Sequence, residues 1–285
     1  MEEKNSYTDI NAATWDQWAR DGIAWSIPVT HQAFQQAREG QWDVVLTASR
    51  PVPHHWFGEL SGKRVLGLAS GGGQQIPIFC ALGAVCTVFD YSQEQLAREQ
   101  MVAQREGYAV EIVRGDMTQP LPFADESFDL VFHPVSNCYI EDVQHVWEEC
   151  FRVLRPGGRL LAGMDNGLNF LFNDVGTLPL TVSNPLPFNP LRGSQEELQR
   201  MVEQGEGVQF SHSLEEQLGG QLKAGFLLRD LYEDRDPEGS CLLRDYAPPV
   251  HSHPGGKARR WAVKRGGFSK KLLTKGVAEA IIIPR

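Results

Sequence analysis

Long apolar runs, a signal peptide and a regular cysteine framework are all missing from this sequence of 285 residues. No apolar run approaches the length that spans a bilayer, and the opening residues MEEKNSYTDI are polar and acidic, unlike a signal peptide. The five cysteines are odd in number and show no C-x-x-C spacing, which predicts reduced thiols rather than a disulfide framework. We therefore expect a cytoplasmic protein with no membrane partner and no metal.

An excess of positive charge is also missing. The chain has 36 acidic and 27 basic side chains, and its formal net charge of −9 at pH 7 repels phosphate backbones. The short basic run from Lys257 to Arg265 is more typical of solvated residues beside a strand. We therefore expect no nucleic-acid partner. The composition, 41% hydrophobic and 22% charged, predicts an ordinary globular protein with a full core.

A glycine cluster follows the first predicted strand, in the stretch VLGLASGGGQQ at 65–75. Ile76 stands where the third glycine of a nicotinamide-binding G-x-G-x-x-G loop would be. No Gly-Lys-Ser/Thr follows, so the stretch is not a Walker loop either. What remains is a strand, a glycine turn and a helix N-terminus, whose free backbone N–H groups face something small and polar.

Strands and helices alternate through the central part of the chain. The predicted strands cover 63–69, 84–89, 110–115, 128–133 and 159–164, and the clearest helix covers 141–154, where apolar residues recur every three or four positions. Such repeats predict an α/β fold with a doubly wound, mostly parallel sheet. The glycine cluster, Asp90, Asp116 and His133 follow the carboxyl ends of these strands, where ligands of such sheets bind.

The flanking segments differ from this core in composition. Residues 1–60 hold five of the seven tryptophans and predict an aromatic-rich N-terminal cap. The core covers 61–265, with a lid insertion at 166–212 that is rich in Asn, Pro, Gly and Phe. Two further strands are predicted at 226–232 and near 260–265, which makes a seven-stranded sheet, and 266–285 forms a C-terminal tail.

Several of these stretches in this order resemble one known family. VLGLASGGG, VFDYS, GDM, FDLVFH and RVLRPGGRLL together resemble the class I S-adenosylmethionine-dependent methyltransferases, most closely those that act on small molecules. The resemblance covers 62–163, with a looser match at AGFLLRDLYE and RRWAVK. It implies a Rossmann-like methyltransferase fold, S-adenosyl-L-methionine as cofactor and a small-molecule methyl acceptor as partner. The oligomeric state stays open.

The resemblance also implies which residues contact the cofactor. The loop from Ala69 to Gly73 would pass the methionine part, Asp90 would accept both ribose hydroxyls, and Tyr91 would pack on the adenine. The full set of cofactor-binding residues so implied is Ala69, Ser70, Gly71, Gly73, Gln75, Asp90, Tyr91, Asp116, Met117 and His133. Gly67 stands where the family usually has an acidic residue, and Gln74 or Gln75 would supply replacement hydrogen bonds.

The chemistry of methyl transfer requires alignment of a nucleophile and exclusion of water, and a general base helps when the acceptor is a hydroxyl or a protonated amine. The predicted catalytic residues are His133, ranked first because it ends the fourth strand, and Tyr139. Asp165 and His212 are the other candidate bases. The aromatic residues of the cap and of the lid favour an apolar or aromatic acceptor.

Two other interpretations stay open at this point. The first is a non-catalytic S-adenosylmethionine-binding or regulatory protein on the same fold, because a fold alone does not establish activity. The second is a nicotinamide-dependent oxidoreductase, which Ile76 and the lack of a Tyr-x-x-x-Lys set disfavour.

Overall fold

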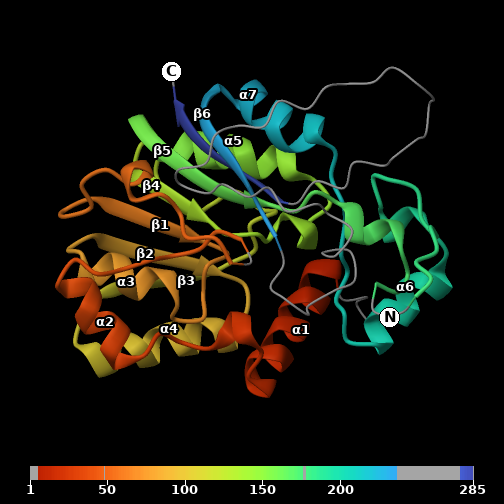
Figure 1. Cartoon of the computed structure of the whole chain (residues 1–285), viewed down its shortest axis with the longest axis horizontal. Helices are drawn as coiled ribbons and strands as arrows, with labels where there is room; N and C mark the ends of the chain where they lie inside the picture. Colours follow the sequence, from red (N-terminus) through yellow and green to blue (C-terminus); the bar gives the residue numbers. More distant parts are fainter. Residues whose placement is uncertain (1–5, 48, 176–177, 236–276, 285) are drawn as a thin grey trace, which may run out of the picture.

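Five parallel strands form the centre of the protein (Figure 1). The computed structural model describes residues 6–47, 49–175, 178–235 and 277–284. The parallel strands are β1 Arg64–Leu68, β2 Val85–Asp90, β3 Val110–Arg114, β4 Phe128–His133 and β5 Leu154–Met164. They lie in the order β3-β2-β1-β4-β5, so the direction of winding reverses between β1 and β4. The predicted doubly wound α/β sheet is confirmed, and such a reversal creates a crevice for ligands at the carboxyl ends of the strands.

Two antiparallel strands extend the sheet beyond β5. Strand β7, Val277–Pro284, pairs antiparallel with β5 on one side and with β6, Phe226–Asp234, on the other. The strand predicted near 260–265 lies outside the described residues, and the structure places β7 in the segment for which we expected only a tail. Its run of three isoleucines, 281–283, is typical of a strand, because β-branched side chains fit an extended backbone.

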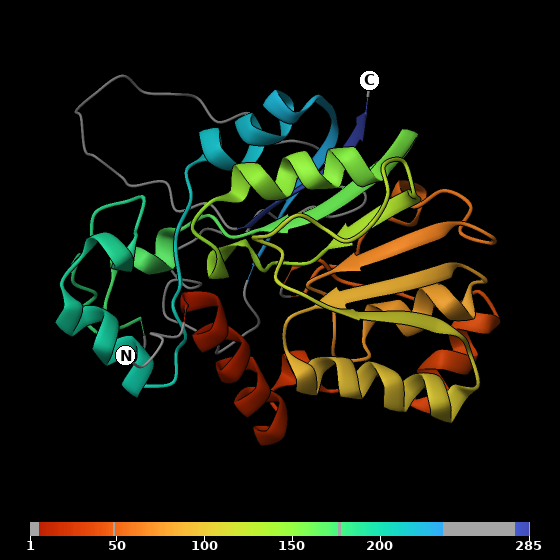
Figure 2. The same ribbon diagram turned by 180° about the vertical axis from the view of Figure 1, so that it is seen from behind.

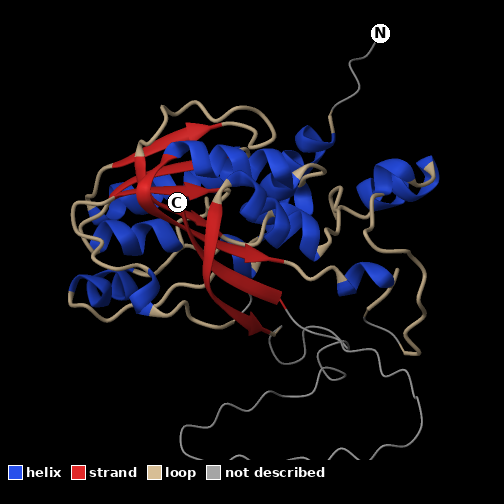
Figure 3. Ribbon diagram, turned by 90° about the horizontal axis from the view of Figure 1, so that it is seen from above, coloured by secondary structure: helices blue, strands red, loops and turns tan. Residues whose placement is uncertain are grey.

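Helices cover both faces of the sheet (Figures 1 and 2). The helices are α1 Tyr7–Asp21, α2 His31–Arg38, α3 Gln75–Ala81, α4 Gln93–Glu106, α5 Val143–Val153, α6 Gln195–Glu203 and α7 Gly220–Ala224. Helices α2, α3 and α4 lie on one side, and α5 and α7 on the other. Helix α6 and the segment around it stand apart from the sheet, as the view from above also shows (Figure 3).

The start of α4 differs in one respect from a capping box, in which the N-cap residue and the residue three positions later exchange two hydrogen bonds. The Ser92 hydroxyl accepts the Gln95 N–H at 3.2 Å, as an N-cap does. The reciprocal bond, in which the Gln95 side-chain oxygen would accept the Ser92 N–H, does not form, because that N–H donates to the carboxylate of Asp90 at 3.0 Å. A charged acceptor binds more strongly than an amide oxygen, so the side chain of Gln95 is released from the cap.

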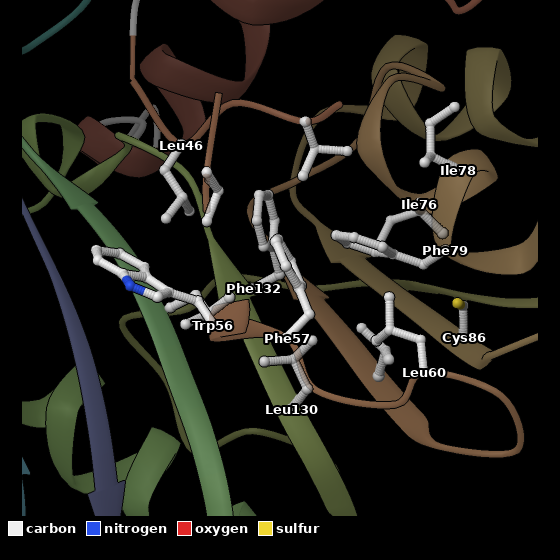
Figure 4. Packing of buried hydrophobic residues seen from close by; sticks show 14 of the residues in the cluster. Leu46, Trp56, Phe57, Leu60, Ile76, Ile78, Phe79, Cys86, Leu130 and Phe132 are labelled. Atoms are coloured by element: carbon white, nitrogen blue, oxygen red, sulfur yellow. The ribbon is translucent and has the colours of Figure 1, made fainter. Parts of the chain in front are cut away.

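The hydrophobic core has one cluster on each face of the sheet. On the α3 side, Val44, Leu46 and the segment 52–60 pack onto β4, with the ring of Phe57 stacked 6.2 Å from that of Phe132 (Figure 4). Trp56 is buried there, and its indole N–H donates to Asp230 of β6 at 3.0 Å. On the other face, α5 buries Trp147 completely. Part of the predicted N-terminal cap therefore belongs to the core.

The segment 44–47 crosses the carboxyl end of the sheet at close range. The Leu46 carbonyl accepts the Val135 N–H at 3.0 Å. The same oxygen lies 2.4 Å from the position that a Cβ atom on Gly163 of β5 would take. On the other side, Asp234 accepts the Thr47 hydroxyl at 2.6 Å. These contacts fix this segment as a rigid wall above β4 and β5.

We expect Gly163→Ala to destabilise the protein by about 1–3 kcal/mol, because the added methyl group must displace backbone rather than a flexible side chain. The matched control is Gly219→Ala, where the nearest atom would lie at an ordinary 3.6 Å, and we expect its stability to stay close to that of the wild type. Urea unfolding measures both. An unchanged midpoint of urea unfolding for Gly163→Ala would contradict the close contact between the Leu46 carbonyl and Gly163.

Candidate functional site

A cavity of about 430 Å³ opens at the carboxyl ends of the parallel strands. Its walls come from α1, the segment 45–47, the glycine turn after β1 and the loops after β2 to β5. A volume in this range holds a small organic ligand. The predicted residues that line it are Ala69, Ser70, Gly71, Gln75, Asp90, Tyr91, Asp116, Met117 and Tyr139. Two predicted residues, Gly73 and His133, are not among the lining residues.

Asp90 ends β2 and presents its carboxylate to the cavity. One oxygen accepts the Gly71 N–H at 2.9 Å, and the other accepts the Ser92 N–H at 3.0 Å. Burial raises the pKa of this carboxyl, while the backbone hydrogen bonds act in the opposite direction. Because each carboxylate oxygen has a second lone pair, the oriented group retains capacity to accept hydrogen bonds from two neighbouring hydroxyls.

The glycine turn after β1 forms a cradle that side chains would fill. A Cβ atom on Gly71 would lie 2.7 Å from the Cβ of Gln95 and 2.9 Å from Asp90 Oδ2. Ala69, which begins the turn, has a φ of 48°, a left-handed conformation that is strained for a residue other than glycine. The turn therefore exposes backbone rather than side chains to a ligand.

The side of the cavity near β3 is fixed by polar contacts. Asp116 Oδ1 accepts both the N–H and the hydroxyl of Thr118 at 2.8 Å. The Tyr91 hydroxyl donates to Asp9 of α1 at 2.6 Å, and the guanidinium of Arg114 lies 5.2 Å from the centre of the Tyr91 ring. The ring of Tyr91 is thus held at its tip and from one face.

Helix α1 is bonded to both ends of the cavity. At one end, Asp16 accepts the Ser92 hydroxyl at 2.6 Å. At the other, the Asn11 amide donates to the carbonyl of Tyr139 at 3.0 Å and to that of Val208 at 2.9 Å. Asn11 and Asp16 were not predicted from the sequence. Their hydrogen-bond partners lie 76 to 197 residues away, and no local sequence pattern indicates such distant contacts. The buried position of Asn11 within a helix is the signal that the structure adds.

His133 has a structural position rather than the predicted catalytic one. It is fully buried, with Nδ1 3.0 Å from the Leu68 carbonyl and Nε2 2.8 Å from Asn137 Oδ1. Its ring packs edge-on against Trp147, and burial lowers its pKa. Because both ring nitrogens have protein partners and the residue does not line the cavity, we correct the expectation of a base or cofactor contact here.

Gly73 also points away from the cavity, although it belongs to the glycine turn. A Cβ atom there would lie 2.8 Å from Val102 of α4, and the Gly73 carbonyl accepts the Val29 N–H at 2.8 Å. Its φ of 69° suits glycine. Gly73 therefore allows the turn to pack against α4, and a cofactor contact at this residue stays a prediction.

Tyr139 and Asp165 are the candidate bases that line the cavity. The Tyr139 ring packs edge-on against Trp15 of α1 at 5.5 Å. Burial and the nearby Asp165 carboxylate raise the pKa of Tyr139 well above its usual value, so it stays a neutral hydroxyl. His212 does not line the cavity and donates through Nε2 to the carbonyls of Asn137 and Ile140.

The position of Gly67 has no room for a side chain. A Cβ atom there would lie 2.4 Å from Ile76 Cδ1, so Ile76 occupies the space that an acidic residue would need. Gln74 lines the cavity, so a replacement hydrogen bond to its amide oxygen stays a prediction. Its amide donates at 2.9 Å to the carbonyls of Ala24 and Ile27, which holds the segment 24–27 against the turn.

Metal ligands do not cluster in the described part of the chain, where no three His, Cys, Asp or Glu side chains converge. The ring of His54 stacks on Trp42, and its Nε2 lies 2.8 Å from the carbonyl of that residue. His251 and His253 lie outside the described residues. Of the helices in the same described part, none combines the length and the apolar character needed to cross a membrane.

Comparison with known proteins shows the family. A sequence family described as a methyltransferase domain matches residues 66–162. The uncharacterised methyltransferase YbaJ of Bacillus subtilis is 39% identical over 253 residues, which cover 87% of this chain and 96% of YbaJ. The chain belongs to the S-adenosylmethionine-dependent methyltransferases.

Other methyltransferases match a part of the chain or its fold. A demethylmenaquinone methyltransferase of Mycobacterium sp. (strain KMS) is 44% identical over 102 residues, which are 35% of this chain and 40% of that protein. The structure of an S-adenosylmethionine-dependent methyltransferase from Mesorhizobium loti covers 80% of this chain and 94% of its own at 17% identity, with a TM-score of 0.54. This second match shows a shared fold.

The cavity fits S-adenosylmethionine, the cofactor of this methyltransferase. Gly71 lines the cavity, and the absence of a Cβ atom lets its backbone lie against Asp90 and Gln95. The Asp90 carboxylate retains lone pairs suited to a ribose diol. Both observations, made on the described residues, agree with the cofactor that methyltransferases of this family use.

Glu99 of α4 lies buried behind the glycine turn. Its Oε1 accepts the Tyr108 hydroxyl at 2.9 Å. The side chain is fully buried, and burial raises its pKa from 4.5 to about 7. Folding therefore favours the protonated form of the Glu99 carboxyl.

We expect the stability contributed by the protonated Glu99 to be present below pH 4.5 and to be lost as pH rises to about 7. In the wild type, this titration should lower the free energy of unfolding by about 3 kcal/mol as pH rises. Glu99→Gln should abolish that decrease and flatten the dependence of unfolding free energy on pH between about pH 5 and 8. Urea unfolding at a series of pH values measures it, with the exposed Glu203→Gln as control. A variant profile as steep as that of the wild type would show that Glu99 is not the group that titrates.

Proposed function

We propose that this methyltransferase acts on a small molecule that has an apolar body and carries no negative charge. Charge in the cavity supports the proposal. Among the described residues, the charged side chains that line the cavity are Asp90, Asp116 and Asp165, and no Lys, Arg or His accompanies them. Three carboxylates in one concave site disfavour an anionic acceptor, whereas they tolerate a neutral or cationic one.

The sheet order separates a cofactor end from an acceptor end. Asp90 and Asp116 follow β2 and β3, whereas Asp165 follows β5 on the other side of β1 and β4. Neighbouring strands lie roughly 4.8 Å apart, so β2 and β5 are roughly 14 Å apart. This span accommodates a nucleoside at one end and an acceptor at the other, with the glycine turn of β1 between them.

Apolar groups dominate the acceptor end. Trp15, Val45, Leu46, Val135 and the ring of Tyr139 line it, and Leu46 belongs to the rigid wall described above. These groups contact an acceptor by burial rather than by directed hydrogen bonds. The proposal therefore retains the apolar or aromatic acceptor expected from the sequence, and it adds the exclusion of negative charge.

Two residues at this end are suited to the chemistry. When bound, S-adenosylmethionine supplies an electrophilic methyl group on a sulfonium. Asp165 is the residue we propose as proton acceptor for a hydroxyl or ammonium nucleophile, because it lines the cavity as a carboxylate at the end of β5. When the acceptor is a hydroxyl, the neutral Tyr139 donates a hydrogen bond that orients its oxygen.

We also propose that α1 is the cap of this cavity and that the segment 166–212 is its lid. Asn11 supports both roles, because its amide joins α1 to Tyr139 at the cavity and to Val208 in the lid. The Val208 N–H returns a bond to Asn11 Oδ1 at 2.6 Å. Closure of these elements would exclude water from the reacting atoms.

Asp90→Asn should weaken the binding of S-adenosylmethionine and S-adenosylhomocysteine on the order of tenfold or more, because a charged acceptor of two hydroxyls is lost. Calorimetric titration measures it, with Asp125→Asn as a matched control whose side chain is 75% exposed. NADH should bind to neither protein. Unchanged affinity in Asp90→Asn would remove Asp90 from the cofactor site, and binding of NADH alone would favour an oxidoreductase.

Asp165→Asn should lower kcat on the order of a hundredfold with little change in the Kd of S-adenosylmethionine, because only the base is lost. Release of S-adenosylhomocysteine measures turnover over a panel of paired acceptors, such as a phenol or an aryl amine beside its carboxylated form. The uncharged or cationic member of each pair should react. Preference for the anionic members would contradict the proposed acceptor class, and cofactor binding with no turnover on any acceptor would favour a non-catalytic binding protein.

A further inference from the structure

Three buried polar side chains form a hydrogen-bonded chain at the loop that follows β4, residues 134–140, which we call the β4 loop. His133 Nε2 lies 2.8 Å from Asn137 Oδ1, and the Asn137 amide donates to Gln217 Oε1 at 3.0 Å. None of the three residues lines the cavity. Apolar side chains of the same shape would stabilise a core about as well, but a bonded polar chain also fixes orientation.

The imidazole of His133 joins the β4 loop to the neighbouring strand. The backbone pairing of β1 with β4 ends one residue before Leu68 and His133. The Leu68 carbonyl lies 3.0 Å from His133 Nδ1, and because a carbonyl oxygen only accepts, Nδ1 is the donor. The residues that follow in the two chains, Ala69 and Pro134, both line the cavity. A side chain therefore continues the pairing of the strands where both segments reach the cavity.

The backbone of the β4 loop is also held from other elements. Each carbonyl from residue 137 to residue 140 accepts a hydrogen bond from a distant residue. The donors are His212 Nε2 for Asn137 (3.1 Å) and Ile140 (3.0 Å), the Phe210 N–H for Cys138 (2.7 Å) and the Asn11 amide for Tyr139 (3.0 Å). Cys138 and Tyr139 thus line the cavity from a backbone whose position is fixed.

We propose that His133 and Asn137 are positioning residues for methyl transfer. They fix the β4 loop, which carries Tyr139 at the proposed acceptor end, relative to the end of β1. Methyl transfer needs an in-line approach of the acceptor, so a small shift between these segments lowers the rate while both ligands still bind. Neither residue lines the cavity, and both act through Tyr139. This inference rests on the proposed function, in which the Tyr139 hydroxyl orients a hydroxyl acceptor.

A double-mutant cycle with Tyr139→Phe tests whether the two residues act through Tyr139. His133→Asn retains an amide donor near the position of Nδ1 but is too short to reach Asn137. Asn137→Ala removes the other end of the same contact. The control is Val153→Ala, because Val153 is fully buried in α5 and does not line the cavity. Release of S-adenosylhomocysteine with a hydroxyl acceptor gives kcat, and calorimetric titration gives the Kd of S-adenosylmethionine.

We expect His133→Asn and Asn137→Ala each to lower kcat on the order of tenfold, with the Kd of S-adenosylmethionine within about twofold of the wild type. In the Tyr139→Phe background, neither should lower kcat further by more than about twofold, because the group that they position is gone. Val153→Ala should lower the melting temperature and leave kcat close to that of its parent in both backgrounds.

Alkylation of Cys138 by iodoacetamide reports on the β4 loop without any acceptor. Cys138 lines the cavity, whereas Cys150 of α5 is fully buried and reports on opening of the whole fold. Peptide mass spectrometry measures both rates in one sample. His133→Asn and Asn137→Ala should label Cys138 on the order of tenfold faster with no change at Cys150. If His133→Asn fails to fold, Asn137→Ala decides the result, because it leaves the imidazole in place.

Additive losses of kcat in the Tyr139→Phe background, or equal acceleration at Cys138 and Cys150, would assign His133 and Asn137 to general stability and overturn the inference. Unchanged kcat, or a loss of S-adenosylmethionine affinity as large as the loss of kcat, would overturn it as well. Each of these results leaves the proposed function standing.

Turnover of amines alone would remove the role of the Tyr139 hydroxyl, and this inference with it, while the proposed acceptor class stands. If the wild type binds S-adenosylmethionine but turns over no acceptor, the proposed function itself fails and this inference fails with it.

Discussion

The hydrogen bonds of one carboxylate organise the cofactor end of the protein. Asp90 ends β2, accepts the N–H of Gly71 in the turn after β1, and accepts the N–H of Ser92 at the start of α4. Three elements thus converge on two oxygen atoms. The turn can approach that closely because Gly71 has no Cβ, and the helix cap is changed because Asp90 competes with the Gln95 side chain for the same N–H. The shape of this end of the cavity follows from this arrangement.

The acceptor end depends on a different constraint, which is the contact of backbone with backbone. The segment 44–47 lies against β5 at Gly163, bonds to the loop after β4 through Leu46, and is held by Asp234 at the end of β6. The carboxylate of Asp234 also accepts the N–H groups of Ser49 and Arg50 at 2.8 Å. An edge strand remote from the glycine turn therefore sets the shape of the wall at the proposed acceptor end.

Local patterns in the sequence predicted the parallel strands, the helix α5 and the cavity-lining positions of Asp90 and Asp116, because these depend on periodicity and on residues at strand ends. His133 shows where that reasoning stops. A residue at a strand end can point toward the cavity or back into the fold, and the choice here depended on Leu68 and Asn137, whose contacts no spacing encodes. The position of β7 and the contacts of α1 were missed for a similar reason, since they are pairings between distant segments.

Asn11 has a consequence for how the two ends of the cavity communicate. The helix that it belongs to contacts Tyr91 and Ser92 at the cofactor end, while its amide holds the backbone of Tyr139 at the acceptor end. A shift of α1 on ligand entry at one end therefore displaces a residue that lines the other. Under the proposed function, α1 would link the binding of the acceptor and the cofactor, and by reciprocity an acceptor that fixes the position of α1 would also strengthen cofactor binding.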